Sequence, residues 1–166
     1  MNKHLVRVLD NYPRLVIERN SLVQQLTHFK GVSVEDVIDT MYSTKLDGEY
    51  MRATRLPDKT GFIAVNYEER REQINHDWRE YLEKKLARMN EEINFLEVSI
   101  DALYEPLRSV MKDMLLNGHT WDYLEEAYHV SRTTISRYRK KALAEMSAFY
   151  DLRETMLTEF LSTSVR

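Results

Sequence analysis

Five basic side chains and no acidic one lie between Ser131 and Leu143, although the whole chain carries a net charge of −3 at pH 7. The five are Arg132, Arg137, Arg139, Lys140 and Lys141. Cations at this density can hold phosphate groups, and an arginine can also donate two hydrogen bonds to a guanine edge. Because the molecule as a whole is not a polycation, any binding to nucleic acid is expected to be local to this segment.

The same segment sorts into two faces when it is placed on a helix at 100° per residue. The inner side carries Ile135, Tyr138 and Ala142. The outer side carries Thr133, Thr134, Ser136, Arg137, Lys140 and Lys141. A helix that enters the major groove needs an apolar face for its own domain and a polar, basic face for the DNA. A solvated basic face is the plainer alternative, and the sorting favours DNA.

Turn and cap signals divide the surrounding chain into short helices. A helix is expected from Pro106 to about Leu116, with Asn117-Gly118 as its stop. Thr120 is expected to cap the next helix, which should end at 128–130, and Ser131 to cap the basic one. The order is that of a helix-turn-helix.

Residues 104–146 resemble region four of bacterial RNA polymerase sigma factors, the helix-turn-helix that reads the upstream promoter element. The resemblance rests on four short motifs: Leu107-Arg108-x-Val110, Thr120-Trp121, Val130-Ser131-Arg132-x-x-Ile135 and Lys141-Ala142-Leu143. The Thr-Trp opening and the long charged helix before it are more similar to phage regulators of late genes, of the ArpU and RinA types. The resemblance implies a DNA-binding transcriptional activator. Whether RNA polymerase is a further partner stays open.

Two residues depart from the family pattern, and the N-terminal region has no counterpart in it. Glu125 stands where a small residue is usual at the helix crossing, and His129 where a turn glycine is usual. A slightly splayed turn is therefore expected. Residues 1–56 have no equivalent in region four.

These observations give a DNA-binding site with two kinds of contact. We expect Ser131, Arg132, Lys140 and Lys141 to hold phosphates, and Thr133, Thr134 and Arg137 to face base edges, with Ser136 beside them. Phosphate contacts set register and affinity, whereas base contacts set sequence preference. Trp121 could touch DNA, but core packing is favoured for a tryptophan early in a helix of a small domain.

The remainder of the chain predicts an all-α protein in three segments: an N-terminal helical region with a loop over 1–59, a long central helix over 60–103, and the helix-turn-helix domain over 104–166. Pro13 should end the first helix or open the next, Ser33 should cap a short helix, and 43–59 should form the loop. The central helix carries a heptad stripe: Leu82, Leu86, Met89, Ile93, Leu96, Ile100 and Leu103. This stripe could be a homodimer seam or could be covered by the helices of 1–42.

Several chemistries find no support in the residues. The chain has no cysteine, which excludes disulfides, zinc fingers and a thiol nucleophile. His76, His119 and His129 have no ligand partners at metal spacing, so no metal or cofactor is expected. Ser131 and Ser136 lack a histidine and an acid as partners, and the glutamates of the long helix suit ion pairs, so no enzyme is expected. No apolar run suggests a signal peptide or a membrane span, which fits a cytoplasmic protein.

Two other functions stay open. A phage DNA-packaging protein of the small-terminase type also joins a helix-turn-helix to a long helix, and it would form a ring larger than a dimer. A coiled-coil scaffold protein would use the basic helix to meet an acidic partner, and it would show no preference between duplex sequences.

Overall fold

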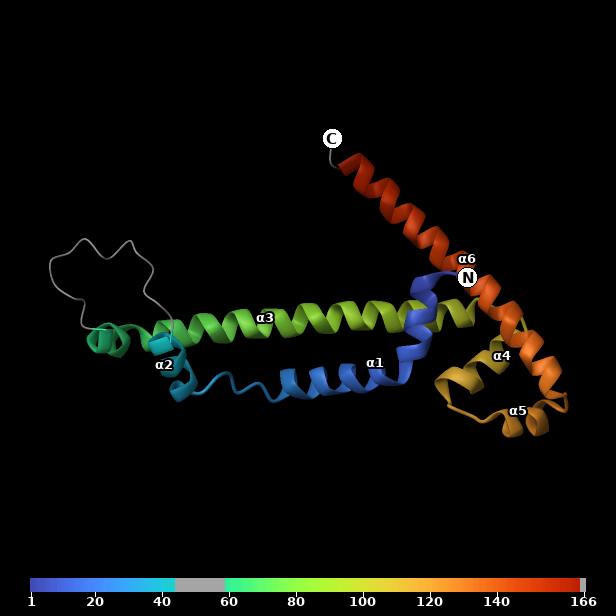
Figure 1. Cartoon of the computed structure of the whole chain (residues 1–166), viewed down its shortest axis with the longest axis horizontal. Coiled ribbons are helices and arrows are strands. Elements are labelled where there is room, and N and C mark those ends of the chain that lie inside the picture. The colour runs from blue at the N-terminus through green and yellow to red at the C-terminus, as the bar shows by residue number, and fades with distance from the viewer. Residues whose placement is uncertain (44–58, 165–166) are drawn as a thin grey trace. The chain divides into compact units, whose positions relative to one another are not determined.

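The computed structural model describes residues 1–43 and 59–164, and every regular element in these ranges is a helix (Figure 1). In chain order they are α1 (Lys3–Thr27), α2 (Val34–Ser43), α3 (Lys59–Asp101), α4 (Leu107–Met111), the π-helical turn η1 (Lys112–Leu116), α5 (Trp121–Tyr128) and α6 (Arg132–Ser164). The predictions of an all-α fold and of a long central helix are confirmed. The predicted loop at 43–59 falls almost wholly on 44–58, outside the described residues.

The chain forms two compact units, one of residues 1–19 and 88–166, the other of residues 20–87. Both α1 and α3 contribute to each unit, so the units cut across the three sequence segments. The first unit contains the whole helix-turn-helix, together with the parts of α1 and α3 that support it.

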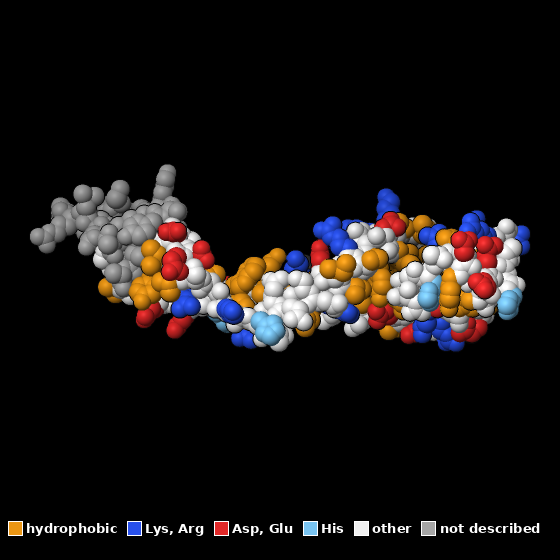
Figure 2. Space-filling view, turned by 90° about the horizontal axis from the view of Figure 1, so that it is seen from below, with side chains coloured by type: hydrophobic (Ala, Val, Ile, Leu, Met, Phe, Trp, Pro, Cys, Tyr) orange, Lys and Arg blue, Asp and Glu red, His pale blue; other side chains and the backbone are white. Residues whose placement is uncertain are grey.

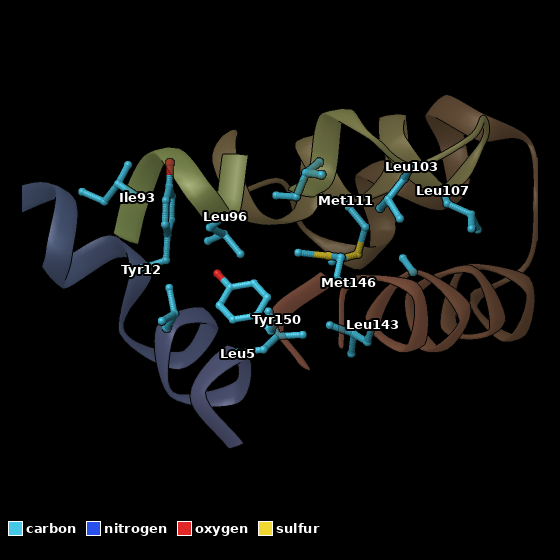
Figure 3. Close-up of a cluster of buried hydrophobic side chains, with 13 residues drawn as sticks. Leu5, Tyr12, Ile93, Leu96, Leu103, Leu107, Met111, Leu143, Met146 and Tyr150 are labelled. Atoms are coloured by element: carbon cyan, nitrogen blue, oxygen red, sulfur yellow. The ribbon is translucent and has the colours of Figure 1, made fainter. Parts of the chain in front are cut away.

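The core of the first unit is a cluster of buried apolar side chains from α1, α3, α4, α6 and the segment that follows α3 (Figure 3). Its members are Leu5, Val8, Tyr12, Ile93, Leu96, Ile100, Leu103, Leu107, Met111, Ala142, Leu143, Met146 and Tyr150. Full burial of a side chain such as Leu or Ile contributes about 1.5–3 kcal/mol. A core drawn from the two ends of the chain and its middle therefore fixes the position of α6.

The heptad stripe of α3 is covered within one chain where it enters this core. Ile93, Leu96 and Ile100 are fully buried, and Leu103 is nearly so. Their neighbours come from α1, α4 and α6. The sequence left open whether this stripe is a homodimer seam or is covered within one chain. In the structure of the single chain, these positions are covered by helices of the same chain.

Pro13 lies inside α1, so the expectation that it ends this helix or opens another is wrong. Proline lacks a backbone N–H and crowds the carbonyl of Leu9 one turn earlier, which bends a helix without always ending it. Figure 1 shows α1 bent along its length. Burial of Leu5, Val8 and Tyr12 on one side compensates for the lost hydrogen bond, and the Tyr12 hydroxyl also donates to Glu97 Oε1 at 2.9 Å.

In the second unit the connection between α1 and α2 is held on α3. Gly31 has φ +73°, and a Cβ at this position would collide with the side chain of Asn75. Asn75 Oδ1 accepts the backbone N–H of Val32 at 2.8 Å. The predicted cap at Ser33 is confirmed, because its Oγ accepts the N–H of Asp36 at 3.0 Å and donates to that carboxylate at 2.8 Å.

Candidate nucleic-acid interface

The three helices at the end of the first unit pack around a small apolar core of their own. Val110 of α4, Leu124 of α5 and Ile135 of α6 are all fully buried in it. Four partly buried side chains surround them: Met114, Tyr128, Val130 and Tyr138. The inner face predicted for α6 is thus confirmed at Ile135 and at Ala142, which lies in the larger core.

The helix starts also agree with the sequence. The side chain of Thr120 accepts the N–H of Tyr123 at 3.3 Å and caps α5. Ser131 lies at the start of α6, where its Oγ accepts the N–H of Thr134 at 3.4 Å. Side chains that accept N–H groups of the first turn favour the start of a helix at these positions.

Tyr128 anchors α5 to the turn that precedes it. Its hydroxyl donates to Asp113 Oδ2 at 2.7 Å. Burial of the phenol, followed by the hydrogen bond to Asp113, raises the pKa of Tyr128 to about 12. Asp113 also accepts from Asn117 Nδ2 at 2.8 Å, and its backbone carbonyl accepts the N–H of His119 at 2.9 Å. The carboxylate of Asp113 therefore joins Asn117, at the start of the α4–α5 connection, to Tyr128, the last residue of α5.

The turn between α5 and α6 places His129 in a left-handed conformation, with φ 51° and ψ 39°. Glycine enters this region without strain, whereas other residues pay for the contact of Cβ with the backbone. His129 therefore has a backbone geometry that glycine adopts more readily. Val130 N–H donates to the carbonyl of Glu125 at 3.3 Å, which closes the helix end.

Glu125 connects the two helices. Its Oε1 accepts the backbone N–H of Arg132 at 2.7 Å, and its Oε2 accepts Nε of the same residue at 3.0 Å. Asp122 makes a further ion pair with this guanidinium. The hydrogen bond to Asp122, together with its charge, raises the pKa of Arg132. In the free protein, Arg132 is therefore held against α5.

This pairing was missed at the sequence level. Asp122 and Glu125 lie one turn apart on a short helix, and Arg132 follows across a tight turn, so the signal was present in the spacing. Figure 2 shows acidic side chains gathered over the region of α5, on the side of the molecule that it views. The phosphate-binding role expected for Arg132 stays a prediction.

The other cations of the basic segment are exposed. Arg137, Lys140 and Lys141 lie on the outside of α6 with Ser131, Thr133 and Ser136, while Thr134 is half-buried. Among the described residues no carboxylate pairs with Arg137, Arg139, Lys140 or Lys141. The structure thus brings Thr133, Ser136, Arg137, Lys140 and Lys141 together on the exposed face of α6. Arg132 is held against α5 instead, and the other three of the four predicted cations are unpaired.

A shallow depression lies beside this face, between the start of α5 and the first turns of α6. Its lining consists of Trp121, Arg132, Thr133, Ser136 and Arg137. Trp121 is 37% exposed and belongs to neither core cluster, so the preference for core packing of this residue is wrong. An indole here adds a flat apolar wall next to a basic helix.

Other chemistry finds no constellation in the part of the chain that the structure describes. No group of three histidine, aspartate or glutamate side chains is placed to hold a metal ion there. The glutamates on α3 do form ion pairs, as in Glu80 with Lys84 at 2.5 Å and Glu83 with Arg79 at 3.4 Å. In the same described residues, no helix is both long and apolar enough to cross a membrane.

No protein-family model, curated protein or solved structure matches the chain.

Proposed function

We propose that this chain binds double-stranded DNA in a sequence-specific manner, as a phage or prophage transcriptional regulator with α6 as its recognition helix. The observation that carries the proposal is the two-sided character of the first turns of α6. Ile135 and Ala142 are fully buried, and Arg137, Lys140 and Lys141 are exposed and unpaired. A helix with one apolar face packed on its own domain and one cationic face exposed can fit into the major groove of DNA, where the electrostatic potential is negative.

The supporting helices favour the same use. α5 is fixed to α6 through Glu125 and to the preceding turn through Tyr128. Because these contacts already fix the helices in the free protein, less conformational entropy is lost on binding. In this arrangement Thr133 and Arg137 reach base edges, while Lys140 and Lys141 contact phosphates on either side.

Acidic side chains on α5 act against indiscriminate binding. Asp122 and Glu125 hold Arg132, so part of the positive potential of α6 is neutralised in the free protein. Affinity for an arbitrary duplex is therefore expected to be modest, and contacts to the correct bases must contribute the difference.

Selection of bound duplexes from a random pool, followed by sequencing, tests the proposal. We expect enrichment of a short common sequence, and a log–log salt slope of roughly −0.9 for each phosphate that is neutralised. A slope near zero would exclude DNA binding. Salt-dependent binding without any enriched sequence would exclude sequence-specific regulation and favour the packaging alternative. A preference for acidic proteins over all duplexes would favour the scaffold alternative.

A further inference from the structure

The end of α6, from Leu152 to Ser164, carries large apolar side chains that nothing in the described chain covers. The helix leaves the core after Tyr150, which is 1% exposed, and continues to Ser164. Beyond it the exposed fractions are high: Leu152 58%, Met156 61%, Leu157 57%, Phe160 62% and Leu161 51%. Figure 1 shows this red part of α6 running past the other helices of its unit. A contiguous group of large apolar side chains in contact with water marks a surface for a partner.

The side chains of these turns sort into an apolar half and a polar half. With Met156 at zero and 100° per residue, Leu152 and Phe160 lie within about 40° of it, and Leu157 and Leu161 lie toward the side that faces the core earlier in the helix. The acidic and hydroxyl side chains lie together on another face: Asp151, Glu154, Thr155, Thr158, Glu159 and Ser162. Two copies of the apolar half could therefore meet with most of their acids turned outward.

An apolar groove between α3 and α6 continues this surface. It is lined by Phe95, Val98, Ser99 and Ala102 of α3 and by Phe149, Leu152, Arg153 and Met156 of α6. The one cation in the lining, Arg153, is already engaged, since its guanidinium lies 4.4 Å from the Phe95 ring centroid and pairs with Glu91 and Glu92. The lining thus contains no unpaired charge, which suits an apolar occupant.

We propose that this groove receives the end of α6 from a second copy of the chain, which gives a two-fold homodimer. The exposed apolar side chains at the end of α6 and the groove belong to the same chain. A two-fold axis therefore lets each copy place the end of its α6 in the groove of the other. Seven large apolar side chains form the combined surface: Val98, Phe149, Leu152, Met156, Leu157, Phe160 and Leu161. If each exposes on the order of 100 Å², the surface measures about 700 Å² per copy, close to the roughly 800 Å² per partner of a stable interface.

Charge argues against a lipid surface as the occupant. Helices that lie on anionic membranes carry lysine and arginine on their polar face. Here the polar face holds Asp151, Glu154 and Glu159 and no cation. The dimer surface also differs from the heptad stripe of α3, which is buried at Ile93, Leu96 and Ile100.

The dimer does not depend on DNA binding, so each can fail alone. Where both hold, α6 supplies recognition at one end and assembly at the other. Two recognition helices related by a two-fold axis would then read two half-sites in inverted order.

Sedimentation equilibrium without DNA tests the proposal, on the parent chain and two double variants. Met156→Glu with Phe160→Glu places charges on the apolar half, while Thr155→Glu with Thr158→Glu places the same charges on the polar half. We expect the parent and the polar-face variant to be dimers at micromolar concentration, and the apolar-face variant to be a monomer with unchanged helical circular dichroism. A monomeric parent, a ring larger than a dimer, or a dimeric apolar-face variant would overturn the proposal.

Cross-linking provides a second measurement that does not rely on disruption. The chain has no cysteine, so Val98→Cys can be placed in one tagged copy and Phe160→Cys in another. Oxidation of the mixture should yield a disulfide-linked product of the two, whereas Thr158→Cys in place of Phe160→Cys should yield little. Equal yields from both pairs would overturn this packing.

Discussion

Glu125 and Arg132 are joined by two hydrogen bonds, at 2.7 Å to the backbone N–H and at 3.0 Å to Nε. One carboxylate therefore caps α6 and fixes the first cation of the basic segment at the same time. Asp122 completes the set from one turn away on α5. A phosphate could therefore bind the guanidinium of Arg132 only in competition with these two carboxylates.

Asp122→Asn should release Arg132 in part without removing the cap that Glu125 provides. Affinity for duplex DNA of any sequence is expected to rise, and the salt slope should steepen by up to about one unit if a new phosphate contact forms. Fluorescence anisotropy over a range of salt concentrations measures both quantities. Glu126→Gln is the matched control, because it changes the net charge equally on the same helix and has no contact with Arg132. Equal gains from both variants would mean that net charge alone is responsible.

Arg137→Ala and Lys140→Ala should differ in kind. Arg137 is placed at the centre of the outer face, so its loss should weaken binding to the selected sequence by about 1–3 kcal/mol more than binding to an unrelated duplex. Lys140→Ala should weaken both duplexes alike and flatten the salt slope by about one unit. Arg139→Ala removes the same charge away from this face and should have the smallest effect. Parallel titrations of two duplexes distinguish these outcomes, and identical losses from all three variants would contradict the assigned roles.

His129→Gly should stabilise the helix-turn-helix. At φ 51° and ψ 39° a side chain costs on the order of 1 kcal/mol relative to glycine, partly offset by the greater entropy of glycine in the unfolded chain. A rise in Tm of a few degrees is expected, with unchanged DNA preference. His129→Ala keeps the Cβ and should give no rise. Thermal unfolding, monitored by circular dichroism, measures the change. A higher Tm for His129→Gly indicates that the turn is strained in the parent, and an unchanged Tm indicates that it is not.

Much of the fold followed from the sequence because its signals are local. Helical periodicity and caps such as Thr120, Ser131 and Ser33 act over a few residues, so they could be read directly. The bend at Pro13 could not, because the outcome depends on Leu5, Val8 and Tyr12 packing against α3 and α6. A proline in a helical sequence is as consistent with the end of the helix as with a bend in it.

Tertiary partners were also the limit for the candidate site. The outer face of α6 follows from a fixed angle per residue, and its exposed cations lie where that angle puts them. The pairing of Arg132 with Asp122 and Glu125 depends on how α5 crosses α6. The exposure of Trp121 depends on the position of the start of α5 beside α6. For the same reason the heptad stripe left dimer and fold-back open, because both bury the same side chains.

Ile93→Ala should lower the free energy of unfolding by about 2–5 kcal/mol, because the residue is fully buried in the core of the first unit. Since this burial is intramolecular, the oligomeric state at micromolar concentration should not change. Chemical denaturation alongside sedimentation measures both properties. Val65→Ala, on an exposed position of the same helix, serves as control and should change neither. Dissociation of a dimer without loss of stability would instead support a seam along the stripe.

Tyr128→Phe should destabilise the helix-turn-helix in a pH-dependent way. The folded protein raises the pKa of Tyr128 to about 12, through burial and then through the hydrogen bond to Asp113. Because the folded state holds the phenol proton more tightly than the unfolded chain does, this contribution is complete below pH 10 and is lost as pH rises toward 12. Urea unfolding of parent and variant at pH 8, 10 and 11 should therefore show a difference in stability that is constant up to about pH 10 and then shrinks. Tyr67→Phe, which removes an exposed hydroxyl of α3 that donates to Glu68 at 3.2 Å, should cause a much smaller loss at pH 8. A difference for Tyr128→Phe that grew with pH would contradict the assigned direction, because it would mean that the folded state favours the phenolate.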